Sequence, residues 1–127
     1  MSIELGFLWL AEVLMFGALG LFIAAYRVRR SDPARHKRLG KLGALIVFVG
    51  LLAVELVARG LDWQFPVRSA PVLKVHIWVA TAALLVLIVL VWTGMRGPRR
   101  VHVRLWPLFF PLFVATNVLS LFAFRLW

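Results

Sequence analysis

The chain alternates between four long apolar runs and short segments that are rich in basic residues. The runs cover about residues 5–26, 42–58, 72–95 and 105–126. Each falls in the range of about 17 to 25 residues that a helix uses to cross the hydrocarbon core of a bilayer. Short connections favour antiparallel neighbours. The pattern therefore predicts an all-α integral membrane protein, with residues 1–127 forming a single transmembrane domain and an up-and-down four-helix bundle.

The third run is the most uniform of the four. Between Val75 and Trp92 its only ionisable side chain is His76, and Ala80 and Ala83 follow on the same helical stripe. A polar residue beside small ones is typical of a face that a membrane helix turns toward its neighbours. By the same reasoning we expect four other small residues to lie at helix contacts: Gly17, Gly20, Gly40 and Ala44.

The distribution of basic residues predicts how the bundle is oriented in the membrane. Residues 27–41 and 96–104 hold eleven of the fifteen lysines and arginines. Cytoplasmic loops carry such an excess, so both segments are predicted inside and both termini outside. We expect a multi-pass protein of the cytoplasmic (inner) membrane, with Trp127 at the outer end of the last span.

The formal charge of +10 would suggest nucleic acid as the partner of a soluble protein. Here 63% of the residues are hydrophobic and the charges lie beside apolar runs, so membrane topology is the better explanation. We expect anionic lipids at the inner loops, other membrane-protein subunits as partners and no nucleic acid. The chain has no cysteine, which excludes disulfides and thiolate metal sites.

Each predicted helix places one polar side chain in the outer half of the membrane. From the helical rise, these side chains lie roughly 6 to 13 Å inside the outer boundary. An unpaired carboxylate in hydrocarbon costs at least about 2.5 kcal/mol, so we expect the group to face inward. The four residues form one candidate site for copper, zinc or iron, or a proton relay: Glu12, Glu55, His76 and Asn117.

A purely structural alternative explains the same residues. Glu55 would pair with His76 or Arg59 and join helices, while Glu12 would reach toward the interface or stay protonated. Two further histidines, His36 and His102, each precede an outgoing span and could ligate a haem as a pair. The alternative for this pair is that both are solvated or meet lipid phosphates.

Three short motifs carry a resemblance to a known family. RHKRL at 35–39 opens the second helix, LKVHI at 73–77 opens the third, and VHVRLWPL at 101–108 leads into the fourth. In this arrangement the chain resembles the domain of unknown function 420 family over about residues 27–126. The resemblance implies a small four-helix membrane protein, some relatives being linked to cytochrome c oxidase assembly. The family's polar and aromatic residues late in helix four are replaced here by residues 117–124.

A second resemblance rests on HKRLG at 36–40, which is close to the His-Arg-x-Leu-Gly pattern of small membrane proteins that include relatives of cytochrome b561. Those with haem carry paired histidines within their helices, which this chain lacks. We expect a non-enzymatic accessory or maturation protein that works with a larger respiratory complex, a haem-copper oxidase by resemblance. A membrane redox protein with copper or haem and a small proton-coupled transporter are the alternatives, and four short helices leave little volume for a transport pathway.

Overall fold

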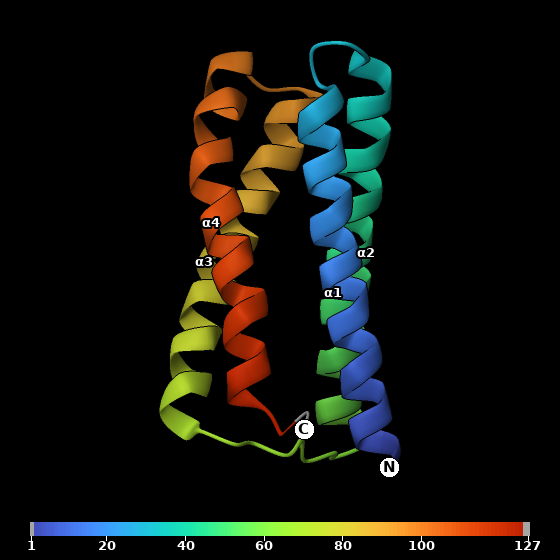
Figure 1. Ribbon diagram of the computed structural model, residues 1–127, viewed down its shortest axis with the longest axis vertical. Coiled ribbons are helices and arrows are strands. Elements are labelled where there is room, and N and C mark those ends of the chain that lie inside the picture. Colours follow the sequence, from blue (N-terminus) through green and yellow to red (C-terminus); the bar gives the residue numbers. More distant parts are fainter. Residues whose placement is uncertain (1, 126–127) are drawn as a thin grey trace. The chain divides into compact units, whose positions relative to one another are not determined.

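The computed structural model describes residues 2–125 and contains four long helices (Figure 1). In their most apolar windows the mean hydropathy lies between 1.7 and 2.5, and all four are long enough to cross a membrane. The all-α class and the four spans are confirmed, and the chain is a multi-pass membrane protein. Leu126 and Trp127 lie outside the described residues. The helices are α1 (Ile3–Val28), α2 (Pro33–Gly60), α3 (Ala70–Met95) and α4 (Arg99–Ala123).

The described chain divides into two compact units, and each is built on one antiparallel helical hairpin. The first unit covers residues 2–67 and 124–125 and contains α1 and α2. The second covers residues 68–123 and contains α3 and α4. Figure 1 shows the two helices of each hairpin side by side, joined by a short turn. Each hairpin thus supplies one of the predicted antiparallel pairs.

Side-chain caps fix where three of the helices begin. The Ser2 hydroxyl accepts from the Leu5 N–H at 3.3 Å, and the Asp32 carboxylate accepts from the Arg35 N–H at 2.9 Å. Ser69 caps α3 in the same way. Such caps satisfy amide groups that have no partner in the first helical turn. Because Asp32 caps α2 at Pro33, the motif at 35–39 lies in the first turns of the helix, as the sequence predicts.

Three of the four small residues expected at helix contacts do not lie at the contact between α1 and α2. A Cβ atom added to Gly17, Gly20 or Gly40 would meet nothing within 4 Å, whereas Ala44 is buried. Gly17 lies about two and a half helical turns after the buried Leu8 and therefore on the opposite side of α1. Small size alone does not tell which side of a helix faces a neighbour.

Other glycines allow the close approach within the first hairpin. A Cβ on Gly43 would lie 2.9 Å from the Phe22 ring, and one on Gly50 would lie 2.5 Å from the Met15 methyl group. The α1–α2 contact therefore follows Phe22 against Gly43 and Met15 against Gly50. Close packing of this kind is what holds helices together in lipid, where burial from water contributes nothing.

The second hairpin has a row of aromatic side chains along α4 and a tight turn. Phe109 and Phe113 are buried on α4 and stack with their ring centroids 5.3 Å apart. Trp106 meets Phe109 edge-on at 5.9 Å. At the turn, a Cβ on Gly97 would lie 2.6 Å from Thr93 Cα, so only glycine fits there without a shift. The hairpin therefore reverses over very few residues.

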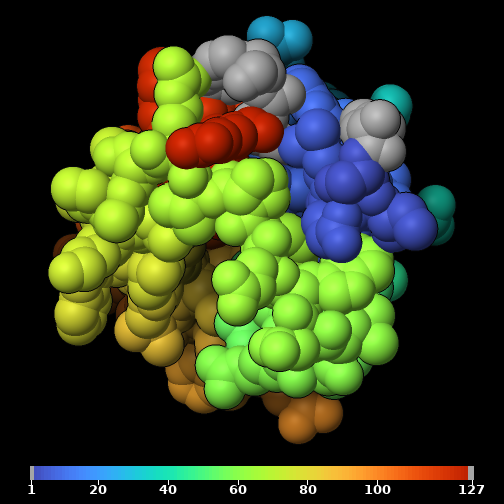
Figure 2. Space-filling model, turned by 90° about the horizontal axis from the view of Figure 1, so that it is seen from below, coloured from blue at the N-terminus to red at the C-terminus, as the bar shows by residue number. Residues whose placement is uncertain are grey.

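The end of the first unit that lies away from the α1–α2 turn is held by aromatic and backbone contacts. Figure 2 views this end, and the green segment after α2 lies on the visible face. In the first unit Phe7 contacts Trp63 and Phe65, at centroid distances of 6.1 and 6.2 Å. Arg125 N–H donates to the Pro66 carbonyl at 2.9 Å, so the last described residues are tied to the same end as residue 2. Both described chain ends therefore lie on one side, and its identity as the outer side stays a prediction.

Candidate functional site

The three histidines share one arrangement. In each, Nδ1 lies within hydrogen-bonding distance of a backbone carbonyl on the neighbouring helix of its own hairpin. The distances are 2.9 Å from His36 on α2 to Ala25 on α1 and 3.1 Å from His76 on α3 to Thr116 on α4. The third is 3.0 Å, from His102 on α4 to Leu90 on α3.

The chemistry of the acceptor sets the tautomer of these rings. A carbonyl oxygen only accepts, so Nδ1 must carry the proton and Nε2 the lone pair of the neutral ring. Each ring therefore joins two helices by an N–H donated to the backbone. The same Nδ1–H to carbonyl contact also orients metal-bound histidines in proteins. The geometry thus fits both the structural and the ligand hypotheses.

The surroundings of His102 show why its position matters in the second hairpin. Thr93 Oγ, buried beside the ring, lies 3.3 Å from Nδ1 and itself donates to the carbonyl of Val89 at 2.8 Å. A Cβ added to Gly94 would lie 3.2 Å from the ring carbon Cε1. Sequence reasoning missed Thr93 because a threonine within an apolar run carries no signal of its own. These neighbours fix the ring against the last turns of α3.

The two carboxylates of the candidate metal site have different surroundings. Glu12 is 6% exposed, so it does not reach out to the interface. Glu55 accepts from Arg59 Nε at 2.6 Å, with side chains that are 60% and 84% exposed. The predicted pairing of Glu55 with Arg59 is confirmed. The two residues lie on the same helix, however, so the pair does not join helices.

Asn117 is the most buried polar side chain of the second hairpin, at 2% exposure. Its Nδ2 donates to the Phe113 carbonyl at 2.7 Å, and Ser120 Oγ donates to the Asn117 carbonyl at 2.8 Å. Among residues 2–125, no hydrogen bond engages the side-chain oxygen of Asn117. A buried polar atom in this state costs free energy, of order 1–3 kcal/mol. Asn117 therefore either lowers the stability of the hairpin or lines a polar site.

The predicted metal and haem sites each draw residues from both units. Glu12 and Glu55 belong to the first unit, while His76 and Asn117 belong to the second. His36 and His102 are divided in the same way. Within the described chain, no three histidine, aspartate or glutamate side chains group closely enough to hold a metal. Both sites stay predictions.

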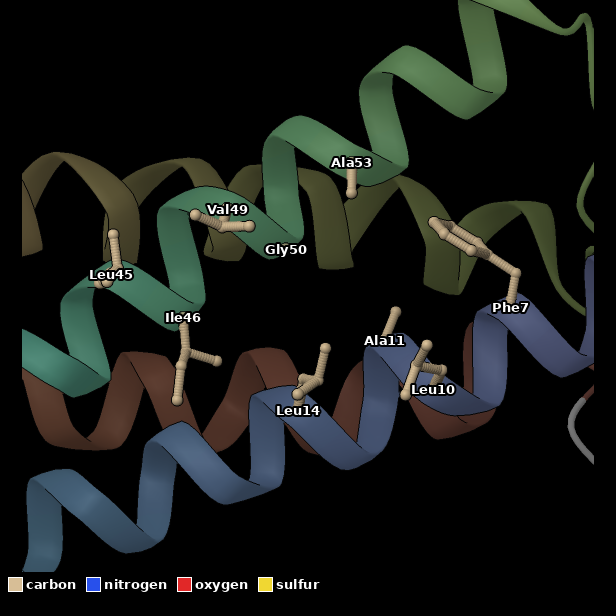
Figure 3. Close-up of a pocket in the computed structure, with 9 residues that line it drawn as sticks. All are labelled: Phe7, Leu10, Ala11, Leu14, Leu45, Ile46, Val49, Gly50 and Ala53. Atoms are coloured by element: carbon tan, nitrogen blue, oxygen red, sulfur yellow. The ribbon is translucent and has the colours of Figure 1, made fainter.

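An apolar groove that the sequence analysis did not predict runs between α1 and α2. Figure 3 shows α2 diverging from α1 toward Phe7, with side chains of both helices around the opening. The groove has a volume of about 320 Å³ and includes three small residues. A groove depends on the rotation of two helices about their axes, which composition does not reveal. It is lined by Phe7, Leu10, Ala11, Leu14, Leu45, Ile46, Val49, Gly50 and Ala53.

Comparison of the chain with protein-family models, with curated proteins and with solved structures found no match. The class that the fold defines is a small all-α multi-pass membrane protein built from two helical hairpins.

Proposed function

We propose that the protein is a non-enzymatic accessory or assembly protein that binds a larger membrane complex sideways, within the bilayer. The observation that supports this proposal is the groove between α1 and α2. Its lining side chains are all apolar, and the small residues Ala11, Gly50 and Ala53 lie among larger ones. The occupant that we propose is a transmembrane helix of the complex.

A helix suits the groove because of what association in lipid requires. Lipid tails are as apolar as leucine, so helices associate through close packing rather than through burial from water. Small residues allow the backbone of a second helix to approach, and Leu10, Leu14 and Leu45 provide walls for its side chains to contact. A ridge of side chains on the partner helix would then lie along the groove, as in ordinary helix packing.

The first complex to test is a haem-copper oxidase. Its support is the resemblance of the motifs at 35–39, 73–77 and 101–108 to the domain of unknown function 420 family, of which some members are linked to oxidase assembly. The inner membrane with its respiratory complexes is the compartment that this proposal requires. The basic ends of the two hairpins, at residues 27–41 and 96–104, would face the cytoplasm.

The test fills the groove without disturbing the rest of α2. Ala53→Trp places a large ring in the groove, and Leu52→Trp is the matched control, because Leu52 is 60% exposed and does not line the groove. Each tagged variant is expressed in the native host, extracted in mild detergent and purified by its tag. Copurifying proteins are then identified and quantified by mass spectrometry.

We expect the wild type and Leu52→Trp to retain the same membrane-protein partners and Ala53→Trp to lose them by at least about tenfold, which corresponds to 1.4 kcal/mol of binding free energy. Oxidase subunits among the lost partners would support the specific proposal. Equal retention by Ala53→Trp and Leu52→Trp would contradict a role for the groove. Specific partners without any respiratory subunit would contradict only the oxidase.

The histidine geometry favours one second candidate, a metal- or haem-binding membrane protein. In all three rings Nδ1 is held by a carbonyl, as it is in many ligating histidines. The test is the absorbance spectrum and metal content of protein purified from its host. A Soret band or stoichiometric copper that disappears in His36→Gln or His102→Gln would support this candidate, and colourless, metal-free protein would contradict it.

A further inference from the structure

The second hairpin carries positive charge with no compensating carboxylate. All five acidic residues of the protein precede residue 63, so residues 68–123 contain none. The same stretch contains six basic residues, four of them at the turn between α3 and α4 or on the first turns of α4. These four are Arg96, Arg99, Arg100 and Arg104.

Three of these arginines surround one open cleft. Arg99, Arg100 and Arg104 line a space of about 480 Å³ together with Val103. Arg100 and Arg104 are four residues apart on a helix, so they lie one above the other on the same side. Val103 is 57% exposed and adds an apolar surface to the cleft. The cleft is therefore bordered by three arginine side chains and one exposed valine.

The arginines of this cleft are available for an external anion. Within residues 2–125, no hydrogen bond or ion pair engages the side chains of Arg99, Arg100 or Arg104. The turn of the first hairpin differs, because Arg29 there lies 3.6 Å above the Tyr26 ring and donates to the Tyr26 carbonyl. Guanidinium groups bind phosphate in a bidentate manner, and their mutual repulsion is relieved when an anion lies between them.

We propose that this cleft binds the headgroup phosphate of an anionic phospholipid. The charge of the cleft requires an anion, and its position favours a lipid over a soluble phosphate. The helix that begins at Arg99 continues directly into a membrane span, so the arginines lie at the level of headgroups. Val103 would contact the glycerol and the start of an acyl chain, which a soluble anion lacks. The proposal is independent of the function assigned to the groove.

The experiment measures lipid binding to the full chain in a neutral detergent. The protein is titrated with dioleoyl phosphatidylglycerol or dioleoyl phosphatidylcholine, and bound lipid is counted by native mass spectrometry. The test variant is Arg99→Gln/Arg100→Gln/Arg104→Gln. The matched control, Arg30→Gln/Lys37→Gln/Arg38→Gln, removes the same charge from the other hairpin. A third variant, with all three cleft arginines changed to lysine, keeps the charge and changes only its geometry.

We expect phosphatidylglycerol to bind the wild type more tightly than phosphatidylcholine does. Each basic residue near an anionic lipid contributes about fivefold in affinity, so the cleft variant should lose about a hundredfold for phosphatidylglycerol. The control should lose clearly less than the cleft variant, because its three residues do not line one cleft, and the lysine variant should fall between the two. Circular dichroism shows whether the glutamine variant keeps its helices, and a folded cleft variant with reduced binding supports the proposal.

Four results would overturn the proposal. Equal losses in the cleft variant and the control would mean that binding follows total charge alone. Equal binding of phosphatidylglycerol and phosphatidylcholine would leave an acidic protein segment as the occupant of the cleft. Displacement of phosphatidylglycerol by an equimolar amount of inorganic phosphate would mean that the cleft binds a free anion rather than a lipid. If the glutamine variant does not fold, the lysine variant decides. Phosphatidylglycerol binding by the lysine variant that equals binding by the wild type would show that charge alone is sufficient, and it would contradict a bidentate site.

Discussion

Gly43→Leu should destabilise the first hairpin, whereas Gly17→Leu should not. A Cβ at position 43 would lie 2.9, 3.1 and 3.2 Å from three carbons of the Phe22 ring, and Phe22 is only 2% exposed. The ring therefore cannot move into open space, and leucine adds three more carbons beyond the Cβ. At position 17 an added Cβ meets nothing within 4 Å. The pair compares the same chemical change at a closed and an open site.

The difference between the two variants gives the magnitude of the clash. Both gain the same helix propensity when glycine becomes leucine, so that contribution cancels in the comparison. Overpacking of a closed contact costs about 1–3 kcal/mol, which is the expected difference in unfolding free energy. The assay is reversible unfolding in mixed micelles, in which a denaturing detergent is titrated and helicity is followed by circular dichroism.

A double-mutant cycle identifies the contact itself. Phe22→Ala alone should cost about 3–5 kcal/mol because it leaves a cavity. Combined with Gly43→Leu it should cost less than the sum of the two single changes, since the leucine then fills part of that cavity. Equal stability of Gly43→Leu and Gly17→Leu, or strict additivity in the cycle, would refute the packing described for α1 and α2.

The remaining predictions concern polar residues and orientation. His102→Ala should lower the unfolding free energy by about 0.6 kcal/mol, typical of a hydrogen bond between membrane helices, and an unchanged value would remove the His102–Leu90 contact from the account. Glu55→Gln should change it by less than about 0.5 kcal/mol, because the ion pair with Arg59 is exposed; a larger loss would point to a further role for the carboxylate. Asn117→Leu, which removes a buried oxygen without a hydrogen bond, should leave stability unchanged or higher, and a marked loss would show that this oxygen has a favourable partner. Cysteines introduced at Ser31 and Ser69 should be labelled from opposite sides of the membrane, and labelling from one side would contradict the topology.

The sequence was sufficient to predict the elements of the fold because their signals are local. Apolar length defines the four spans, and the Asp32–Pro33 pair marks the start of α2 through a cap and a fixed backbone angle. Two helices begin before their predicted spans, because α2 starts at Pro33 and α4 at Arg99, ahead of the apolar residues. Charge patterning predicts where the membrane boundary lies, while the helix itself continues into the basic segment.

The contacts between helices were harder to predict, because they depend on rotation about each helix axis. Every residue changes this direction by about 100°, so Gly17 and Gly43 look alike in sequence and differ completely in surroundings. The same limit applies to the groove, whose lining comes from two helices. His36, His76 and His102 were recognised as unusual, but their carbonyl partners have no sequence signal, since every residue has a carbonyl.

The most direct test of lateral binding through the groove places a photo-crosslinking amino acid at Ala53. The same amino acid at Leu52 is the control, since this neighbouring residue is exposed outside the groove. After illumination of intact host cells, the account predicts a discrete adduct from position 53 with one membrane protein and mainly lipid adducts from position 52. Lipid adducts alone at both positions would contradict the proposal that a partner helix occupies the groove.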